Sequence, residues 1–146
     1  MSATADHAEE RTNPAARLGF EPGQVVQEIG FDDDVEQELR EGIEELTGTE
    51  LVDEDYGDVA DAVVLWFRED DGDLTDALVD ATTMIDEGAP VWLMTPKTGR
   101  DGYVEPSDIG EAATTAGLSQ TKSISAAKDW SGSRLVTPKS ARSSKR

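Results

Sequence analysis

Hydrophobic residues along the chain fall into two patterns, short continuous runs and positions repeated at helical spacing. The continuous runs at residues 61–67 and 90–95 are typical of strands buried on both faces. A shorter β-branched segment, residues 24–29, follows a Pro-Gly turn signal and predicts a first strand. Between and after these runs, apolar residues recur every three or four positions, which predicts helices over residues 35–46, 74–85 and 109–116.

Polar residues and glycines indicate where these helices begin and end. Asp33 followed by Glu36 resembles a capping box at the start of the first helix. Ser107 is the expected N-cap of the third helix. Gly48 and Gly88 are expected to end the first and second helices, because glycine adopts the left-handed conformation found at helix ends.

The last part of the chain predicts a β-hairpin. Residues 120–127 and 133–137 flank Asp129-Trp130-Ser131-Gly132 and read as its two strands. A further short strand is expected at residues 50–52. Because strands and helices alternate before the hairpin, the sequence predicts an α/β fold with a mostly parallel sheet, closed by an antiparallel pair.

The two ends of the chain differ in composition from the part between them. Residues 1–16 are small, polar and acidic, residues 138–146 are rich in serine and basic residues, and neither has apolar periodicity. Such segments bury too little surface to offset their ordering entropy. We therefore expect one α/β domain over residues 17–137 between two disordered tails.

Charge and residue counts exclude several classes of function. The 146 residues include 32 acidic and 13 basic side chains, which gives a net charge of −19. The molecule as a whole is therefore expected to repel nucleic acid and anionic membranes, although a local basic segment could still bind either. With no cysteine and one histidine, the chain lacks the residues for disulfides, thiolate metal sites, cysteine nucleophiles or histidine-based catalysis. No apolar stretch is long enough to span a membrane, so the protein is expected in the cytoplasm.

The turn after the first predicted strand is where many α/β enzymes bind a nucleotide. Here it reads Ile29-Gly30-Phe31-Asp32-Asp33-Asp34, with one glycine and three carboxylates that would repel a phosphate. Clustered carboxylates could instead bind Mg²⁺ or Ca²⁺, but the spacing is not that of a calcium loop. We expect helix capping at this turn, and no cofactor and no metal.

Several stretches together resemble a bacterial family known as domain of unknown function 3052, in its actinobacterial form. They include residues 18–26, the strand at residues 62–67, Val91-Trp92-Leu93 leading to Thr95-Pro96-Lys97-Thr98-Gly99-Arg100, and Lys128-Asp129-Trp130-Ser131-Gly132. The resemblance spans residues 17–137 and implies no activity. The order of elements is also similar to the second half of a methyltransferase, so we expect a small Rossmann-like, methyltransferase-like fold of three layers. Likeness of fold alone does not assign an activity.

The best candidate site is the loop after the second buried strand. Ligands of open α/β sheets bind beyond the carboxyl ends of strands, and this loop combines two basic residues, an aromatic and glycines. The basic residues could clamp an anion or pair with the chain's own surplus acids. Trp130 in the hairpin could pack on the sheet or be exposed for a partner. The candidate binding residues are Lys97, Thr98, Arg100, Tyr103, Asp129, Trp130 and Ser131.

Two functions are compatible with these residues. The first is a non-catalytic, regulatory domain that binds a protein partner through its acidic helices or the candidate loop and hairpin. The alternative is a domain that binds a small molecule or anion in the crevice at the strand ends, with weak transferase chemistry as an option. Homodimerisation through a sheet edge stays open. No residue is assigned a catalytic role.

Overall fold

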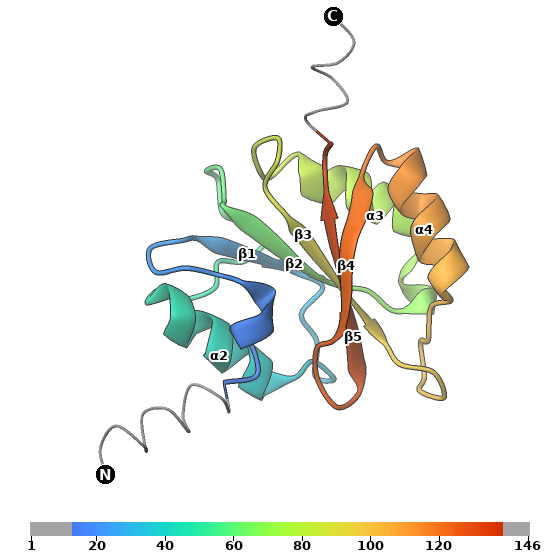
Figure 1. Cartoon of the computed structure of the whole chain (residues 1–146), viewed down its shortest axis with the longest axis horizontal. Coiled ribbons are helices and arrows are strands. Elements are labelled where there is room, and N and C mark those ends of the chain that lie inside the picture. The colour runs from blue at the N-terminus through green and yellow to red at the C-terminus, as the bar shows by residue number, and fades with distance from the viewer. Residues whose placement is uncertain (1–12, 139–146) are drawn as a thin grey trace, which may run out of the picture.

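The computed structural model describes residues 13–138, and within them a five-stranded sheet has helices on both faces (Figure 1). Among these residues no helix combines the length and the apolar character needed to cross a membrane. The elements in chain order are η1 (Ala16–Leu18), β1 (Val26–Ile29), α2 (Gln37–Thr47), β2 (Ala62–Trp66), η2 (Glu69–Asp71), α3 (Leu74–Thr82), β3 (Val91–Pro96), α4 (Pro106–Thr115), β4 (Ser119–Ser125) and β5 (Trp130–Val136).

The sheet has the strand order β1-β2-β3-β5-β4. Strands β1, β2 and β3 run parallel, and β5 lies antiparallel between β3 and β4. The predicted α/β fold, mostly parallel with a C-terminal antiparallel hairpin, is confirmed. In the hairpin, however, Trp130 and Ser131 begin β5 instead of forming the turn, because they pair with Pro96 and Thr95 of β3.

Val52 adds one pairing on the outer edge of β1. Its N–H donates to the carbonyl of Val26 (3.0 Å), and its own carbonyl accepts from the N–H of Glu28 (2.7 Å). The expected strand at residues 50–52 is thus a single bridge. From β1 the chain passes through α2 to Val52 on one side of β1, and then returns to β2 on the other side of β1. A topological switch point therefore lies between β1 and β2, the place where open α/β sheets bind ligands.

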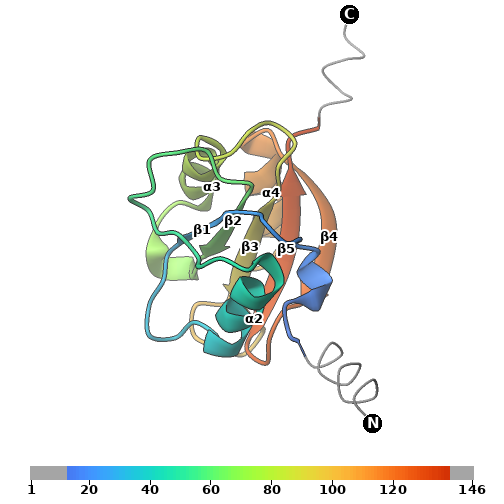
Figure 2. The same ribbon diagram turned by 90° about the vertical axis from the view of Figure 1, so that its left-hand side faces the viewer.

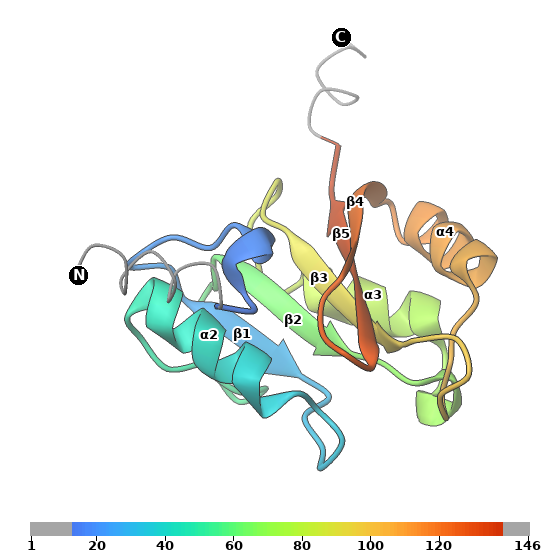
Figure 3. The same cartoon turned by 60° about the horizontal axis from the view of Figure 1, so that its bottom comes forward.

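Two apolar layers form because alternate strand residues point to opposite faces of the sheet. On one face, Leu39 and Ile43 of α2 pack with Trp66 and Trp92. On the other, α3 and α4 cover a second cluster that includes Leu78. Figure 2 shows α2 and α3 on opposite sides of the sheet, and Figure 3 shows η1 beside α2. Each fully buried side chain of this size contributes about 1.5–3 kcal/mol of transfer free energy.

The first helix ends as predicted but begins later. Gly48 has a φ of +78°, and its N–H donates to the carbonyl of Glu44 (2.8 Å). The predicted capping box is wrong, because α2 begins at Gln37 after Glu36, whose side chain makes no capping bond. The aspartates before it bond elsewhere, and the Oδ1 of Asp32 accepts from the N–H of Asp33 (2.8 Å).

The other helix ends also differ from expectation. α4 begins at Pro106 with Glu105 as its N-cap, so Ser107 lies inside the helix; proline at the first helical position needs no N–H partner. α3 ends at Thr82, well before Gly88. Ile85, which was expected in the last turn of this helix, instead forms an isolated β-bridge with Ala60.

The N-terminal boundary of the domain lies earlier than expected. Ala15, assigned to a tail from its sequence, is fully buried in the core. The side-chain amide of Asn13 donates to the carbonyl of Gly42 on α2 (3.4 Å). This close approach requires glycine, because a Cβ at position 42 would lie 2.5 Å from the Oδ1 of Asn13. The rest of the predicted tails, residues 1–12 and 139–146, lies outside the described residues.

Candidate functional site

The carboxyl ends of β1 and β2, at the switch point, are occupied by the side chain of Arg68. Its Nη1 donates to the carbonyl oxygens of Gly30 (2.8 Å) and Trp66 (3.1 Å). Its Nε donates to the carboxylate of Asp34 (3.0 Å), and Nη1 also lies 3.2 Å from Asp71. The Arg68 side chain is only 11% exposed. The guanidinium therefore fills the crevice and ties the two strand ends together.

The charges around Arg68 stabilise one another. Burial opposes the charge of Arg68, but its hydrogen bonds to Asp34 and Asp71 raise its pKa above the ordinary value. The hydrogen bond from Arg68 in turn lowers the pKa of the Asp34 carboxyl. Because the Asp34 side chain is 54% exposed, solvent screens part of this attraction. Asp34, expected to cap a helix, is instead the ion-pair partner of the group in the crevice.

Gly30 is the glycine of the turn where a nucleotide would be sought. Its φ is +83°, and a Cβ added there would lie 2.2 Å from the carbonyl oxygen of Trp66. The turn thus packs directly against the end of β2. Glycine is required here because any side chain would clash with the end of β2.

A buried carboxylate lies on β1, two residues before Gly30. Glu28 on β1 is 5% exposed, and its oxygens accept from Arg40 (2.7 and 2.8 Å) and from the indole Nε1 of Trp66 (2.8 Å). The hydrogen bond to Glu28 raises the pKa of Arg40. The guanidinium of Arg40 also lies over the ring of Phe31, 4.6 Å from its centroid.

Trp130 closes the crevice from the side of β5. It is 3% exposed, and its Nε1 donates to the carbonyl of Asp34 (3.1 Å). Its ring meets that of Trp66 edge to face, with centroids 4.9 Å apart, and the Cζ of Arg68 lies 5.3 Å from its centroid. Of the two alternatives for Trp130, the packed one is confirmed. Its ring is covered and contributes to the crevice instead of an exposed docking surface.

A separate pocket of about 440 Å³ lies beyond the carboxyl end of β3, and we term it the β3-end pocket. It brings together four of the candidate residues, Lys97, Thr98 and Tyr103 from the loop and Ser131 from β5. Further hydroxyl groups come from Thr95 and from two serines of the hairpin, and no carboxylate side chain lines it. The register of the sheet makes the convergence possible, since Ser131 lies opposite Thr95.

The two basic residues of the loop have different partners. The Nη2 of Arg100 lies 2.8 Å from the Oδ1 of Asp129, in an ion pair whose side chains are each about half exposed. The Nζ of Lys97 instead donates to the hydroxyl of Ser125 (2.5 Å), and its backbone N–H donates to the carbonyl of Asp129 (2.9 Å). Pairing with the chain's own acids therefore applies to Arg100, whereas Lys97 has no ion pair among the described residues.

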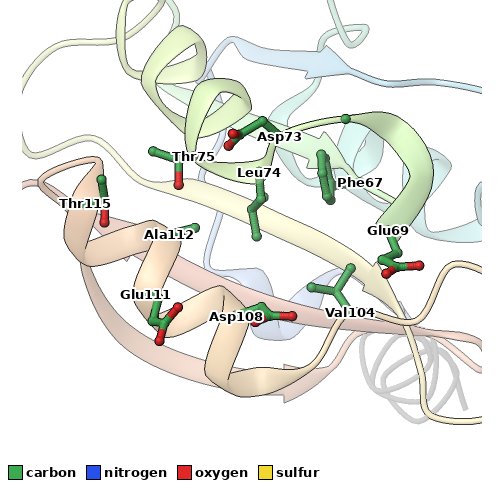
Figure 4. Close-up of a pocket in the computed structure, with 11 residues that line it drawn as sticks. Phe67, Glu69, Asp73, Leu74, Thr75, Val104, Asp108, Glu111, Ala112 and Thr115 are labelled. Atoms are coloured by element: carbon green, nitrogen blue, oxygen red, sulfur yellow. The ribbon is translucent and has the colours of Figure 1, made fainter.

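A third feature is an acidic groove between α3 and α4, lined by Glu69, Asp73, Asp108 and Glu111. Its volume is about 300 Å³. Figure 4 shows Asp73 on one side of the gap, Asp108 and Glu111 on the other, and the side chain of Leu74 between them. Within residues 13–138, no three carboxylates or histidines are grouped closely enough to hold a metal ion. The groove is therefore a negatively charged surface.

Sequence reasoning missed Arg68, which fills the crevice, and the nearly buried ion pair of Glu28 and Arg40. One signal could have found two of them. Residues 1–94 contain 27 acidic side chains and only four basic ones, and Arg40 and Arg68 are two of those four. A basic residue isolated in so acidic a segment has many possible partners and is a good candidate for a structural ion pair.

Comparison with solved structures identifies the fold class as the Rossmann-like fold of S-adenosylmethionine-dependent methyltransferases. The chain matches the pyocyanin biosynthetic protein PhzM at 10% identity with a TM-score of 0.65, covering 89% of this chain and 55% of PhzM. It matches the O-methyltransferase NcsB1 from neocarzinostatin biosynthesis at 14% identity and a TM-score of 0.65, covering 93% of this chain and 56% of NcsB1. The chain thus spans about half the length of these two proteins. At such identities the likeness shows the fold alone.

Within that fold class, residues 15–139 match the family described as "Protein of unknown function (DUF3052)", and the chain belongs to this family. The predicted resemblance is confirmed. Uncharacterized proteins of Mycobacterium bovis and Mycobacterium tuberculosis are each 49% identical over 136 residues, which is 93% of this chain and 84% of theirs. The descriptions of these relatives assign no activity.

Proposed function

We propose that this protein is a non-catalytic domain that binds a small polar anion in the β3-end pocket. The observation that supports the proposal best is the convergence of Lys97, Thr98, Tyr103 and Ser131 on one concavity without carboxylates, in a chain with a net charge of −19. Pockets of this size accept small molecules, and a few convergent polar groups orient them. A likeness of fold to small-molecule methyltransferases gives further, weaker support.

The chemistry of the lining residues defines the ligand class. Lys97 uses one ammonium donor on Ser125, which leaves two for an anionic oxygen. Thr98, Tyr103 and Ser131 supply hydroxyl groups that donate or accept. Val104 and Ile109 provide an apolar wall. A carboxylate or phosphate on a small polar body matches this set.

The non-catalytic role is supported by the closure of the switch point. Enzymes of open α/β folds place ligands where β1 and β2 end. Here Arg68 and Trp130 occupy that place and bond to the backbone around it. The β3-end pocket lies beyond the carboxyl end of β3, and neither Arg68 nor Trp130 lines it.

The proposal is tested by measuring melting temperatures with citrate, malate and glycerol phosphate, followed by calorimetry on any compound that stabilises the protein. Lys97→Ala should abolish the rise in melting temperature. The matched control is Lys128→Ala, which removes the same charge from an exposed position that lines neither the β3-end pocket nor the acidic groove. Equal stabilisation of Lys97→Ala and the unmodified protein would refute the site, as would a panel without any stabilising anion.

A protein partner is the second candidate, because the acidic groove offers a surface for a basic segment. Four carboxylates line it, in a molecule with a large surplus of negative charge. Binding through the groove would weaken steeply with salt. It should be lost in the double variant Asp108→Lys and Glu111→Lys, whereas Lys97→Ala should leave it unchanged.

A further inference from the structure

A second basic pocket lies on the opposite face of the sheet, beneath η1 and near the amino end of β3. Its volume is about 440 Å³, and we term it the η1 pocket. The sheet register builds its floor, since Trp92 on β3 lies opposite Arg134 on β5, and Arg134 lies opposite Lys122 on β4. Paired residues of neighbouring strands share a face. The three side chains therefore form one row across three strands, on the face that η1 and α2 cover.

The charges in this row are unusual for so acidic a protein. Arg134 and Lys122 are directly opposite each other, an arrangement that is destabilising for like charges. Arg17 of η1 adds a third positive charge to the same pocket. No carboxylate side chain lines the pocket, and none of the three has an ion pair within the described part of the chain.

The hydrogen bonds of these three cations hold them in place without neutralising them. The Nη1 of Arg134 donates to the hydroxyl of Thr121 (3.1 Å), and the Nη2 of Arg17 donates to the carbonyl of Ser125 (2.5 Å). The Nζ of Lys122 lies 3.5 Å from the carbonyl oxygen of Arg17. All three acceptors are uncharged, so these hydrogen bonds leave the three positive charges unpaired.

One side of the pocket is apolar, while Gln24 and Thr121 add uncharged polar groups to its lining. Leu18, Phe20 and Pro90 line it beside Trp92, which is fully buried. The indole N–H of Trp92 has no acceptor in residues 13–138. A buried donor of this kind costs about 1–3 kcal/mol when it is left without a partner, so it needs a specific explanation.

We propose that the η1 pocket binds a small molecule that carries a phosphate monoester on a planar apolar body. The row of cations with Arg17 matches a dianionic phosphate, and the Trp92 side of the pocket matches an apolar ring. Arginine and lysine are the usual ligands of phosphate groups. This site lies on the other face of the sheet from the β3-end pocket and does not depend on the proposed function.

The test follows the indole N–H signals of the ¹⁵N-labelled full chain by NMR during titration with phenyl phosphate. Trp92→Phe assigns its signal among the three tryptophans. The expected result is a saturable shift of the Trp92 signal, while the signals of Trp66 and Trp130, which are bonded to Glu28 and Asp34, stay in place. Inorganic phosphate and benzoate should bind more weakly, because the first lacks the ring and the second lacks the second negative charge.

Lys122→Ala is the decisive variant, because this side chain is exposed and its removal leaves the core intact. It should weaken phenyl phosphate binding about tenfold, a loss of about 1.4 kcal/mol. Arg134→Ala should act in the same direction, whereas Lys97→Ala and Lys128→Ala should bind as the unmodified protein does. No saturable shift at millimolar concentration would overturn the proposal, as would a shift that persists in Lys122→Ala and Arg134→Ala.

Discussion

The guanidinium of Arg68 donates a hydrogen bond of 2.8 Å to the carbonyl oxygen of Gly30, 38 residues earlier in the chain. This bond, with the one to Trp66, joins the ends of β1 and β2 where the fold would otherwise leave a ligand crevice. The same arginine contacts the covered ring of Trp130. The switch point is therefore built as part of the protein's stable interior.

Removing this guanidinium should cost much of the stability of the fold. Arg68→Ala leaves two backbone carbonyls and the Asp34 carboxylate without their donor, so we expect a loss of about 2–4 kcal/mol in the free energy of unfolding. Urea denaturation measures it. The control is Arg100→Ala, which breaks an ion pair that is about half exposed and should cost less than about 1 kcal/mol. Equal losses in the two variants would contradict the role of Arg68.

Because of the close contact at Gly30, we expect alanine to lower stability more at this position than at Gly48, although the two glycines have similar φ angles. Gly30→Ala introduces a Cβ at 2.2 Å from the carbonyl oxygen of Trp66, whereas Gly48→Ala meets nothing within 4 Å. Both variants bear the cost of a left-handed residue, about 1–2 kcal/mol. Gly30→Ala should lose clearly more stability than Gly48→Ala in the same denaturation experiment. Similar losses would mean that the strand ends separate without cost.

The buried carboxylate of Glu28 should be sensitive to truncation. Glu28→Ala leaves Arg40 and the indole N–H of Trp66 without their acceptor, for an expected cost of about 3–5 kcal/mol. Glu28→Gln keeps an acceptor oxygen and should cost less. Glu38→Ala, at an exposed position on α2, is the control and should change stability by no more than about 0.5 kcal/mol. Thermal or chemical denaturation of the three variants distinguishes these outcomes.

Acid should weaken the Arg68–Asp34 pair. Because the pKa of Asp34 is lowered in the folded state, its contribution is present above the unfolded pKa, about 3.9, and is lost as pH falls through the lower folded pKa. Asp34→Asn removes this contribution at neutral pH. Its stability should therefore fall less between neutral pH and about pH 3 than that of the unmodified protein. Asp33→Asn, which keeps the pair, should retain the full acid-sensitive loss.

The sequence predicts the strands and helices well because burial leaves a clear pattern. The run at residues 61–67 contains β2, and the helical spacing around Leu39 and Ile43 marks α2. Helix ends were harder, since the bridge between Ile85 and Ala60 depends on how the chain is folded in space. Local sequence contains no information about that contact.

The candidate site could be predicted only in part, for a related reason. Lys97, Thr98 and Tyr103 follow β3 directly, so the rule that ligands bind beyond strand ends selects them. Ser131 reaches the same pocket through the pairing of β5 with β3. The contacts of Arg68 with Gly30 and Asp34 join segments that are distant in the sequence, and no local sequence motif predicts them.

The most direct test of the account is to map where a small anion binds, by backbone amide shifts of the ¹⁵N-labelled chain during titration with the best compound from the melting-temperature panel. The account predicts saturable shifts at Thr98, Tyr103 and Ser131, with no change at Gly30, and their loss in Lys97→Ala. Shifts centred on Gly30, Asp34 and Trp66 would show that the switch point opens to a ligand and would contradict the central claim.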